Sequence, residues 1–356
     1  MPARAVRSYD GSVPANIAAS GAAAAPRPSG RSLARRCADV LLAPSPLAMR
    51  RIALAGLLAA VGIMLTGAGV RLSQSGLGCP DWPRCTATSL VAGGTSGDSL
   101  IHRWVEFGNR LVGVAVFVTA VAVWIAAWRF RPGGRRRRDL VWLASVQPAG
   151  VVAQAVLGGI VVLTKLNPVW VSVHFLLSIG LVAAAVALLV RCTEGTEPAR
   201  PLVRPELRVF AFGVLAVLIL MLAAGTVVTG TGPLAGAASV ARYHLSLSAV
   251  TQLHADIGWL LGGLAIALAL ALHLTAAPAR AIRLGWLLVV LLGVQGTIGY
   301  SQYFSGLPAG LVWVHVAGST VIWVTGLLLV FTLRDRGSVT EPQEPVAEPA
   351  QPAVTG

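Results

Sequence analysis

The sequence predicts an all-α integral membrane protein with eight transmembrane helices, built as two repeated four-helix bundles. Its mean hydropathy is +0.74, and only 12% of its residues are charged. Apolar runs of roughly 20 residues, long enough to cross a bilayer as helices, recur along the chain. They are apolar on most faces, whereas a helix of a soluble core is usually shorter and striped. The two halves of the chain also resemble each other.

Eight such runs follow one another between two polar tails, at about 52–70, 104–128, 140–163, 170–190, 208–229, 250–273, 284–303 and 311–333. We expect an N-terminal half at 49–191 and a C-terminal half at 208–334, joined by a cytoplasmic linker at 192–207. The tail at 1–48 has no apolar run like that of a signal peptide, so we expect a disordered cytoplasmic tail, with a transit peptide as the alternative. The tail at 335–356 is rich in Pro and Glu, and we expect it to be disordered as well.

The net charge of +14 is distributed in a way that argues against a nucleic-acid partner. Of the 28 Lys and Arg residues, 22 fall in the tails and in alternate connections between the helices, and six fall elsewhere. This is the positive-inside pattern, and it predicts that both termini face the cytoplasm. The run Arg135–Arg138 is then a topology anchor near anionic membrane lipid.

A short polar loop, GLGCPDWPRC at 76–85, interrupts this apolar chain. The predicted topology puts the loop on the outer side, where oxidising conditions allow disulfides. Cys79 and Cys85 are close enough in sequence to bridge. Spacing alone leaves open whether such a bridge is a structural staple or takes part in function. Cys37 and Cys192 fall on the cytoplasmic side, where we expect unpaired thiols.

An internal repeat relates the two halves. In each half a Gln precedes a His by 20 residues, which pairs His174 with His315 at an offset of 141. VEFGNRLVG aligns with TQLHADIGW and pairs Asn109 with His254 at an offset of 145. The first half holds about 11 extra residues, which fall in the region of the cysteine loop. Because each half has an even number of helices, the two halves insert in the same orientation.

The repeat-related polar residues gather in the outer leaflet, because each lies near the start of a helix that begins at the outer face. A single His at a helix end is often only interfacial, but three at repeat-related positions indicate function, since polar groups in a membrane are expensive. Zinc normally takes about four protein ligands, or three and a water, and each half offers at most two. A haem needs only one or two axial ligands and suits an apolar bundle, so haem fits better.

The halves differ in their acidic residues. Glu106 lies three residues before Asn109, so the two share a helix face. The repeat equivalent of Glu106 is Thr251, and the second half therefore has His254 and His315 without a carboxylate at that place. This asymmetry indicates one reaction site, in the first half, and one electron-transfer site, in the second.

Over about residues 50–333 the chain resembles the haem A synthase family. The resemblance rests on the GLGCPDWPRC loop, on the motif Glu106-Phe-Gly-Asn109-Arg110 and on the histidines of the duplicated bundle. It implies oxidation of the C8 methyl group of haem O, the substrate, to a formyl group, which gives haem A for terminal oxidases. It also implies a bacterial plasma-membrane protein whose cysteine loop and haem sites lie toward the outer face.

The resemblance assigns roles to individual residues. His254 and His315 would ligate a haem b, which serves as the cofactor. His174 would be an axial ligand of haem O in the first half, and Glu106 would serve catalysis. The cysteine pair resembles the outer-loop disulfide of the family. The implied partners are an electron donor and the synthase that delivers haem O. Whether the protein forms a homo-oligomer is left open by the resemblance.

One residue departs from the family pattern. The commoner motif has His where this chain has Asn109, and an amide nitrogen is a poor iron ligand. His102 lies about two turns earlier, or about 10 Å away along a helix. It is a weak candidate for the missing iron ligand, and an interfacial residue is the favoured interpretation. Arg110 is peculiar to the first half, and it either pairs a haem propionate or lies at the interface.

Two other functions compete with this one. A membrane b-type cytochrome would move electrons without modifying its haem, but a wire across the bilayer needs haems near both faces. A transporter built from parallel repeats would have no reason to hold paired histidines. A Soret absorbance band would distinguish a haem protein from a transporter.

Overall fold

The structure, a computed structural model, describes residues 41–93 and 98–339. Within these residues eight helices are long and apolar enough to cross a membrane, which confirms the predicted all-α membrane fold. They are α2 (Pro46–Leu72), α3 (Asp98–Arg129), α4 (Arg138–Leu163), α5 (Pro168–Arg191), α6 (Pro205–Thr231), α7 (Leu247–Leu274), α8 (Ala279–Phe304) and α9 (Ala309–Phe331). A 3-10 turn, η1 (Pro132–Gly134), and two short strands, β1 (Arg200–Pro201) and β2 (Arg334–Asp335), are also present. Most of the two predicted tails, and Cys37 with them, lies outside the described residues.

The helix starts follow from local sequence. The Ser45 hydroxyl accepts a hydrogen bond from the Ala48 N–H at 3.2 Å and caps α2. Ser246 caps α7 in the same way, and Asn167 caps α5 directly before Pro168. These side chains satisfy N–H groups that the first helical turn leaves free, and Pro suits the first position because its missing N–H is not needed there. Each of these apolar runs therefore has a defined starting point.

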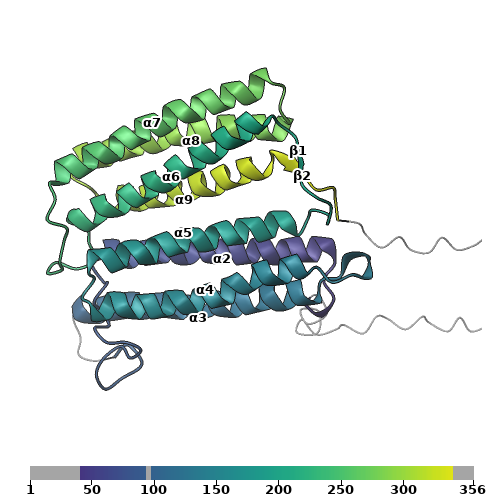
Figure 1. The fold of residues 1–356 in the computed structure, drawn as a ribbon. Coiled ribbons are helices and arrows are strands. Elements are labelled where there is room, and N and C mark those ends of the chain that lie inside the picture. Colours follow the sequence, from purple (N-terminus) through teal and green to yellow (C-terminus); the bar gives the residue numbers. More distant parts are fainter. Residues whose placement is uncertain (1–40, 94–97, 340–356) are drawn as a thin grey trace, which may run out of the picture.

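The helices form two four-helix bundles, α2–α5 and α6–α9, that lie side by side (Figure 1). Helix α9 packs against α2 and α5, and α6 packs against α5. Two indole N–H groups of α9 cross this boundary. Trp313 Nε1 donates to the Leu65 carbonyl at 3.0 Å, and Trp323 Nε1 donates to the Ile179 carbonyl at 2.9 Å. The repeat in the sequence therefore corresponds to a repeat in the fold.

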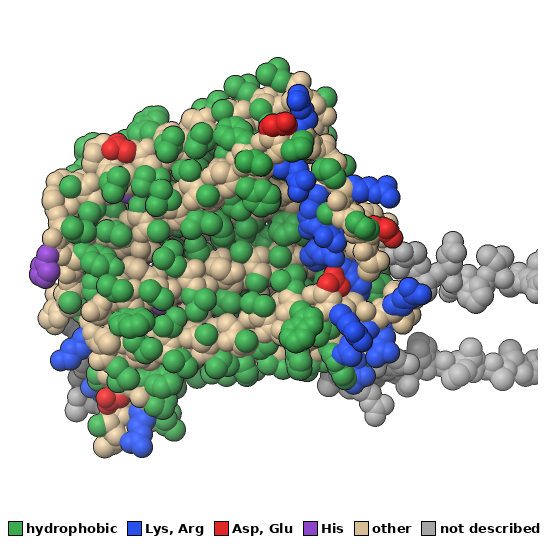
Figure 2. Space-filling model, in the orientation of Figure 1, with side chains coloured by type: hydrophobic (Ala, Val, Ile, Leu, Met, Phe, Trp, Pro, Cys, Tyr) green, Lys and Arg blue, Asp and Glu red, His purple; other side chains and the backbone are tan. Residues whose placement is uncertain are grey.

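The two ends of the molecule differ in chemistry. The cysteine loop lies at one end, the loop end, and many arginine side chains gather at the opposite end, the arginine end (Figures 1 and 2). At the arginine end β1 pairs with β2 in antiparallel register, Arg200 opposite Asp335 and Pro201 opposite Arg334. The segment predicted as a linker between the halves is thus paired with the segment that follows the last helix.

Large apolar side chains cover the outside of the helices (Figure 2). Trp142, Leu274 and Phe304 are 76%, 81% and 78% exposed. Contiguous apolar surface of this kind is unusual for a protein in water, whereas lipid tails accommodate it. The exterior therefore agrees with the helix lengths in placing the bundle in a membrane.

Candidate functional site

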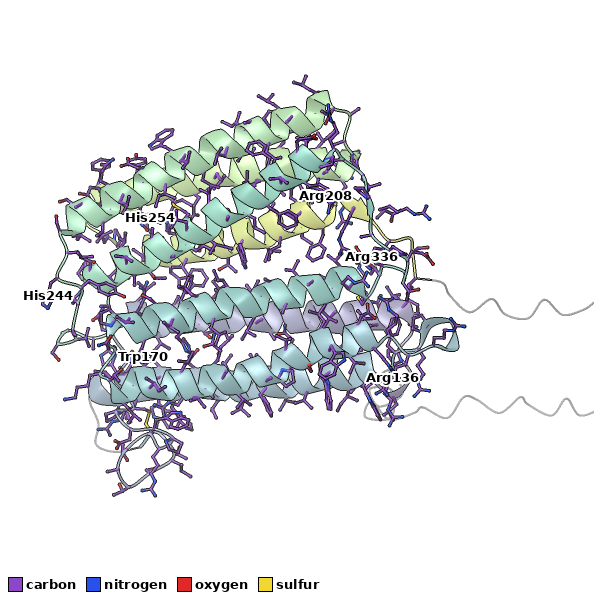
Figure 3. The ribbon with its side chains drawn as sticks, viewed as in Figure 1. Arg136, Trp170, Arg208, His244, His254 and Arg336 are labelled. Atoms are coloured by element: carbon purple, nitrogen blue, oxygen red, sulfur yellow. A yellow bond between two sulfur atoms is a disulfide. The ribbon has the colours of Figure 1, made fainter. Side chains whose placement is uncertain are left out.

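The two histidines of the second half face each other. His254 lies near the start of α7, toward the loop end (Figure 3), and His315 lies near the start of α9. Their ring centroids are 6.3 Å apart, and the ring planes make an angle of 61°. A His nitrogen lies about 2.0–2.1 Å from a metal that it ligates and about 1.1 Å from its ring centre, so two imidazoles on opposite sides of one ion have centres about 6.3 Å apart. The pair therefore fits axial ligation of a haem iron.

Glycines seat both rings against neighbouring helices. A Cβ atom at Gly225 would lie 3.2 Å from His254 Cε1, and one at Gly299 would lie 3.2 Å from His315 Cε1. The Nδ1 atom of each ring is buried, with no hydrogen-bond partner among the described residues. Both residues are only half-buried, and Nε2 of neither ring is among the buried atoms without a partner, so Nε2 is the nitrogen left open to a ligand.

His174 on α5 repeats this arrangement in the first half. A Cβ atom at Gly158 would lie 3.6 Å from His174 Cε1, and the Nδ1 atom is again buried, with no partner in the described part of the chain. Gln154 Nε2 donates to the His174 carbonyl at 3.0 Å. Gln295 Nε2 donates to the His315 carbonyl at 2.7 Å. The Gln that precedes each His by 20 residues therefore anchors the helical turn that carries it.

Asn109 on α3 takes the place that His254 has in the second half. Its Oδ1 accepts a hydrogen bond from Thr66 Oγ1 of α2 at 2.7 Å. An added Cβ atom at Gly67 would lie 4.0 Å from Asn109 Nδ2, which is ordinary van der Waals contact. The amide is thus fixed by a hydroxyl of the neighbouring helix and offers no basic nitrogen to iron. Sequence reasoning missed Thr66, which lies inside an apolar run and carries no signal of the residue that it bonds.

Glu106 is buried, with only 6% of its surface exposed, and both carboxylate oxygens are engaged. Oε2 accepts a hydrogen bond from the Cys79 backbone N–H at 2.7 Å, and Oε1 accepts one from Arg110 Nη2 at 2.7 Å. The second contact is an ion pair one helical turn apart on α3. The carboxylate that the sequence singled out is therefore bonded directly to the cysteine loop.

Arg110 holds the same loop through its main chain. Nη2 donates to the Cys79 carbonyl at 3.0 Å and to the Asp81 carbonyl at 3.1 Å. Nη1 donates to the Arg84 carbonyl at 2.9 Å. Of the two roles that the sequence left open, a propionate partner or an interfacial residue, neither includes this clamp. The guanidinium is used to fix the loop and to orient Glu106.

Cys79 and Cys85 form the predicted disulfide, and both are fully buried. The loop is fixed on two sides. Gly78 lies so close to the His102 carbonyl that a Cβ atom would collide with it, and the indole of Trp82 packs on Gly159 of α4. The disulfide loop is therefore held rigidly against α3 and α4.

His102, the weak candidate for a substitute ligand, contacts the region of the cysteine loop and forms no hydrogen bond with Asn109. Its Nδ1 lies 2.7 Å from Ser75 Oγ, just beyond the end of α2. The hydrogen bond turns the ring toward the α2–α3 connection. The structure thus offers a different use for His102 from iron ligation.

Labelling intact cells with a membrane-impermeant thiol reagent should modify Cys79 and Cys85 only after reduction, because the disulfide leaves no thiol to react and we expect the loop to face outward. Cys192 provides an internal control. It lies at the arginine end, which we expect to face the cytoplasm beyond the reach of the reagent, and burial raises the pKa of its thiol to about 11, so it should stay unlabelled in intact cells. Labelling before reduction would show free thiols, and labelling that needs permeabilised cells would place the loop in the cytoplasm.

Comparison with known proteins identifies a family with this architecture. Residues 50–327 match the family model COX15-CtaA, described as cytochrome oxidase assembly protein. A protein named Heme A synthase from Geobacillus kaustophilus (strain HTA426) is 34% identical over 109 residues, which is 30% of this chain and 30% of the relative. Those from Lysinibacillus sphaericus (strain C3-41) and Bacillus mycoides (strain KBAB4) are 32% and 27% identical over 117 and 138 residues, which is 32% and 39% of this chain and 35% and 42% of those proteins.

The chain thus aligns with less than half of the length of each of these relatives. The family model, by contrast, extends across both four-helix bundles, from the start of α2 to the last turns of α9. The chain belongs to the cytochrome oxidase assembly protein family, COX15-CtaA.

Proposed function

We propose that this protein is a haem A synthase, which oxidises the C8 methyl group of haem O to a formyl group. The observation that carries the proposal is a difference between the two halves at equivalent positions: the second half has two candidate haem ligands, and the first half has one. The second half has His254 and His315 at the spacing of two axial ligands. The first half has His174, with Asn109 opposite it in the repeat and Glu106 on the same helix as Asn109.

The second half would hold a resident haem b. His254 and His315 would ligate it through Nε2, because their Nδ1 atoms are turned into the protein beside Gly225 and Gly299. A bound haem supplies one-electron chemistry, for which the protein sets axial ligands and surroundings. The two glycines let each ring pack closely on its neighbouring helix. This packing would fix the position of each Nε2 atom relative to the iron.

The first half would bind haem O as substrate. His174 would hold it from one side, while the Asn109 amide leaves the other side without a protein ligand. A methyl C–H bond is inert, so the reaction needs an activated oxidant of the kind that haem iron with oxygen can supply. Glu106, kept in place by the Cys79 N–H and by Arg110, would accept or relay a proton at its carboxylate oxygens.

The surroundings of the reaction follow from the same proposal. The protein would lie in a bacterial plasma membrane with its loop end outward and its arginine end in the cytoplasm. A separate synthase would deliver haem O, and a separate donor would supply electrons. The candidate ligands all lie toward the loop end, which favours local chemistry over electron transfer across the bilayer.

Pigment extraction tests the proposal. The chain would be expressed with and without a haem O synthase in a host that lacks haem A, and the extracted haems would be separated by chromatography. Haem A should appear only when both proteins are present. A spectrum with haem b but no conversion of haem O would favour a b-type cytochrome, and a preparation without a Soret band would exclude both.

Haem O-loaded protein should show a high-spin component, because His174 alone would hold the iron. Asn109→His should convert that component to low spin, and Thr66→Ala combined with Asn109→His should do so more completely. The reason is that Thr66 Oγ1 lies 2.7 Å from Asn109 Oδ1, so the larger imidazole at position 109 needs a smaller neighbour on α2. Electron paramagnetic resonance measures both spin states. A fully low-spin unmodified protein would reveal a hidden ligand, and His102→Ala would then identify or eliminate His102.

A further inference from the structure

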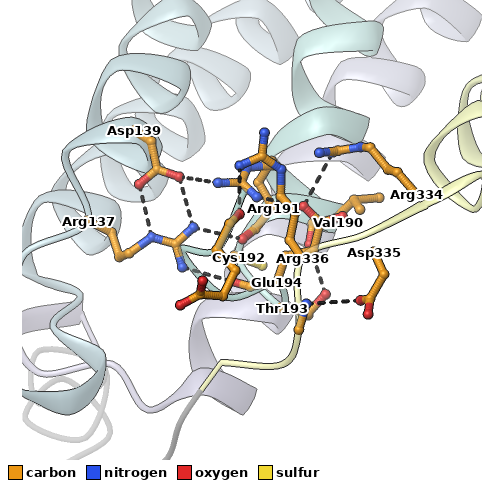
Figure 4. Close-up of polar contacts among 12 residues, drawn as sticks. Arg137, Asp139, Val190, Arg191, Cys192, Thr193, Glu194, Arg334, Asp335 and Arg336 are labelled. Carbon is orange, nitrogen blue, oxygen red and sulfur yellow. Dashed lines mark hydrogen bonds and ion pairs between the residues drawn. The ribbon is translucent and has the colours of Figure 1, made fainter. Parts of the chain in front are cut away.

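Arginine side chains crowd together at the arginine end, where the second half begins and where the chain leaves α9. Figure 4 shows the core of this cluster, and Figure 3 labels Arg208 and Arg336 at its edge. Two carboxylates lie within it. Asp139 pairs with Arg137 at 2.8 Å and with Arg191 at 2.7 Å. Glu194 pairs with Arg191 at 2.7 Å and with Arg334 at 3.3 Å.

Arg208, Arg334 and Arg336 have few or no carboxylate partners among the described residues. Arg208 has no ion pair or side-chain hydrogen bond to any described residue, and it is half-buried. Arg336 Nη1 donates to the Glu197 carbonyl at 3.2 Å, but its Nε is buried without a partner in the described chain. Arg334 has only the longer of the two Glu194 contacts. Burial lowers the pKa of Arg334; the Glu194 carboxylate opposes this shift, and the neighbouring charges of Arg336, Arg191 and Arg208 add to it.

Asp335 and Glu206 form no ion pair with these three arginines within the described residues. The Asp335 carboxylate accepts a hydrogen bond from its own segment, from the Gly337 N–H at 2.9 Å, and is exposed. Glu206 lies 3.6 Å from Arg204, and both of those side chains are largely exposed. Like charges that converge at a half-buried place with unused donors call for an anion from outside the chain.

The position of the cluster selects the kind of anion. Arg208 lies in the first turns of α6, and Arg334 follows the end of α9 by three residues, so both lie at the depth where helices leave the membrane. Phe212, one turn from Arg208 on the same face of α6, is 53% exposed, and Val209 is 72% exposed. An anion that covers both the guanidinium groups and this apolar surface has a charged head and a hydrocarbon tail.

We propose that Arg208, Arg334 and Arg336 bind the phosphate group of an anionic phospholipid, whose acyl chains lie along Phe212 and Val209 of α6. The guanidinium fork suits phosphate oxygens, and basic pockets between membrane helices on the cytoplasmic side are known to take such head groups. The site lies where the two halves meet, so a bound lipid would connect α6 with the segment after α9. This binding is independent of the haem chemistry proposed above.

Native mass spectrometry of the purified full-length protein, titrated with phosphatidylglycerol or phosphatidylcholine in detergent, tests the site. The unmodified protein should retain phosphatidylglycerol in preference. Arg208→Gln with Arg336→Gln should weaken that retention about 25-fold, since each arginine near the membrane surface contributes about fivefold. The matched control is Arg280→Gln with Arg283→Gln, which removes the same charge from exposed positions in the first turns of α8 at the same end.

The control pair should bind phosphatidylglycerol within about twofold of the unmodified protein. Equal losses in the two double variants would show general attraction to a basic surface, and no loss in either would show that the site does not exist; both results overturn the proposal. Arg208→Gln alone guards against misfolding, because its guanidinium bonds to no described residue, and it should lose about fivefold. Inorganic phosphate at the same concentration should not displace the lipid; if it does, the site takes a soluble anion instead.

Discussion

His254→Ala and His315→Ala should each abolish the low-spin haem signature of the purified protein. The two rings sit 6.3 Å apart between α7 and α9, at the separation of two axial ligands, so removing either one breaks six-coordination at the iron. The remaining imidazole would leave a five-coordinate or water-capped haem, or an empty pocket. Optical difference spectra and electron paramagnetic resonance measure the loss directly.

A matched control lies in the same half. His244 is exposed in the connection between α6 and α7, near the loop end, and His244→Ala should leave the low-spin signal unchanged (Figure 3). Co-migration of the variants with the unmodified protein on gel filtration would show that the bundle is intact. Persistence of the low-spin haem in both His254→Ala and His315→Ala would mean that the ligands lie elsewhere.

Glu106→Gln should lower haem A formation about 100-fold or more while leaving the second-half haem spectrum intact, since general acid–base groups contribute about 10²–10⁴-fold. The substitution keeps the size of the side chain and removes its ionisation. The structure adds a second effect. Both carboxylate oxygens accept hydrogen bonds, from the Cys79 N–H and from Arg110, and a Gln can present an oxygen to only one of these donors.

Arg110→Lys separates the two effects. It keeps a cation beside Glu106 but loses the fork that holds the carbonyls of Cys79, Asp81 and Arg84, so it loosens the loop without changing the carboxylate. Haem A formation by Arg110→Lys well above that by Glu106→Gln would assign the loss to ionisation at Glu106. Near-normal turnover by Glu106→Gln would exclude proton transfer there, and equal losses in both variants would assign the role to loop position.

The sequence predicted the parts of the fold that depend on side-chain type and period. Long apolar runs indicated the helices, and the Gln-to-His spacing correctly indicated equivalent positions on α5 and α9, whereas the caps Ser45 and Asn167 were not predicted. Contacts to main-chain atoms were beyond such reasoning. A carbonyl is present at every residue, so nothing in the sequence marks the loop carbonyls that Arg110 binds. The pairing of β1 with β2 was missed for the same reason, because two-residue strands carry no periodic pattern.

The glycines beside the candidate ligands differ in what they permit. Gly225 and Gly299 each face an imidazole so closely that a methyl group would press on the ring, whereas Gly67 faces the Asn109 amide at 4.0 Å, which is ordinary contact. A substitution to alanine should therefore disturb the position of a ring in the second half and leave the Asn109 side chain almost where it is. The two halves thus differ in mutational tolerance at these glycines.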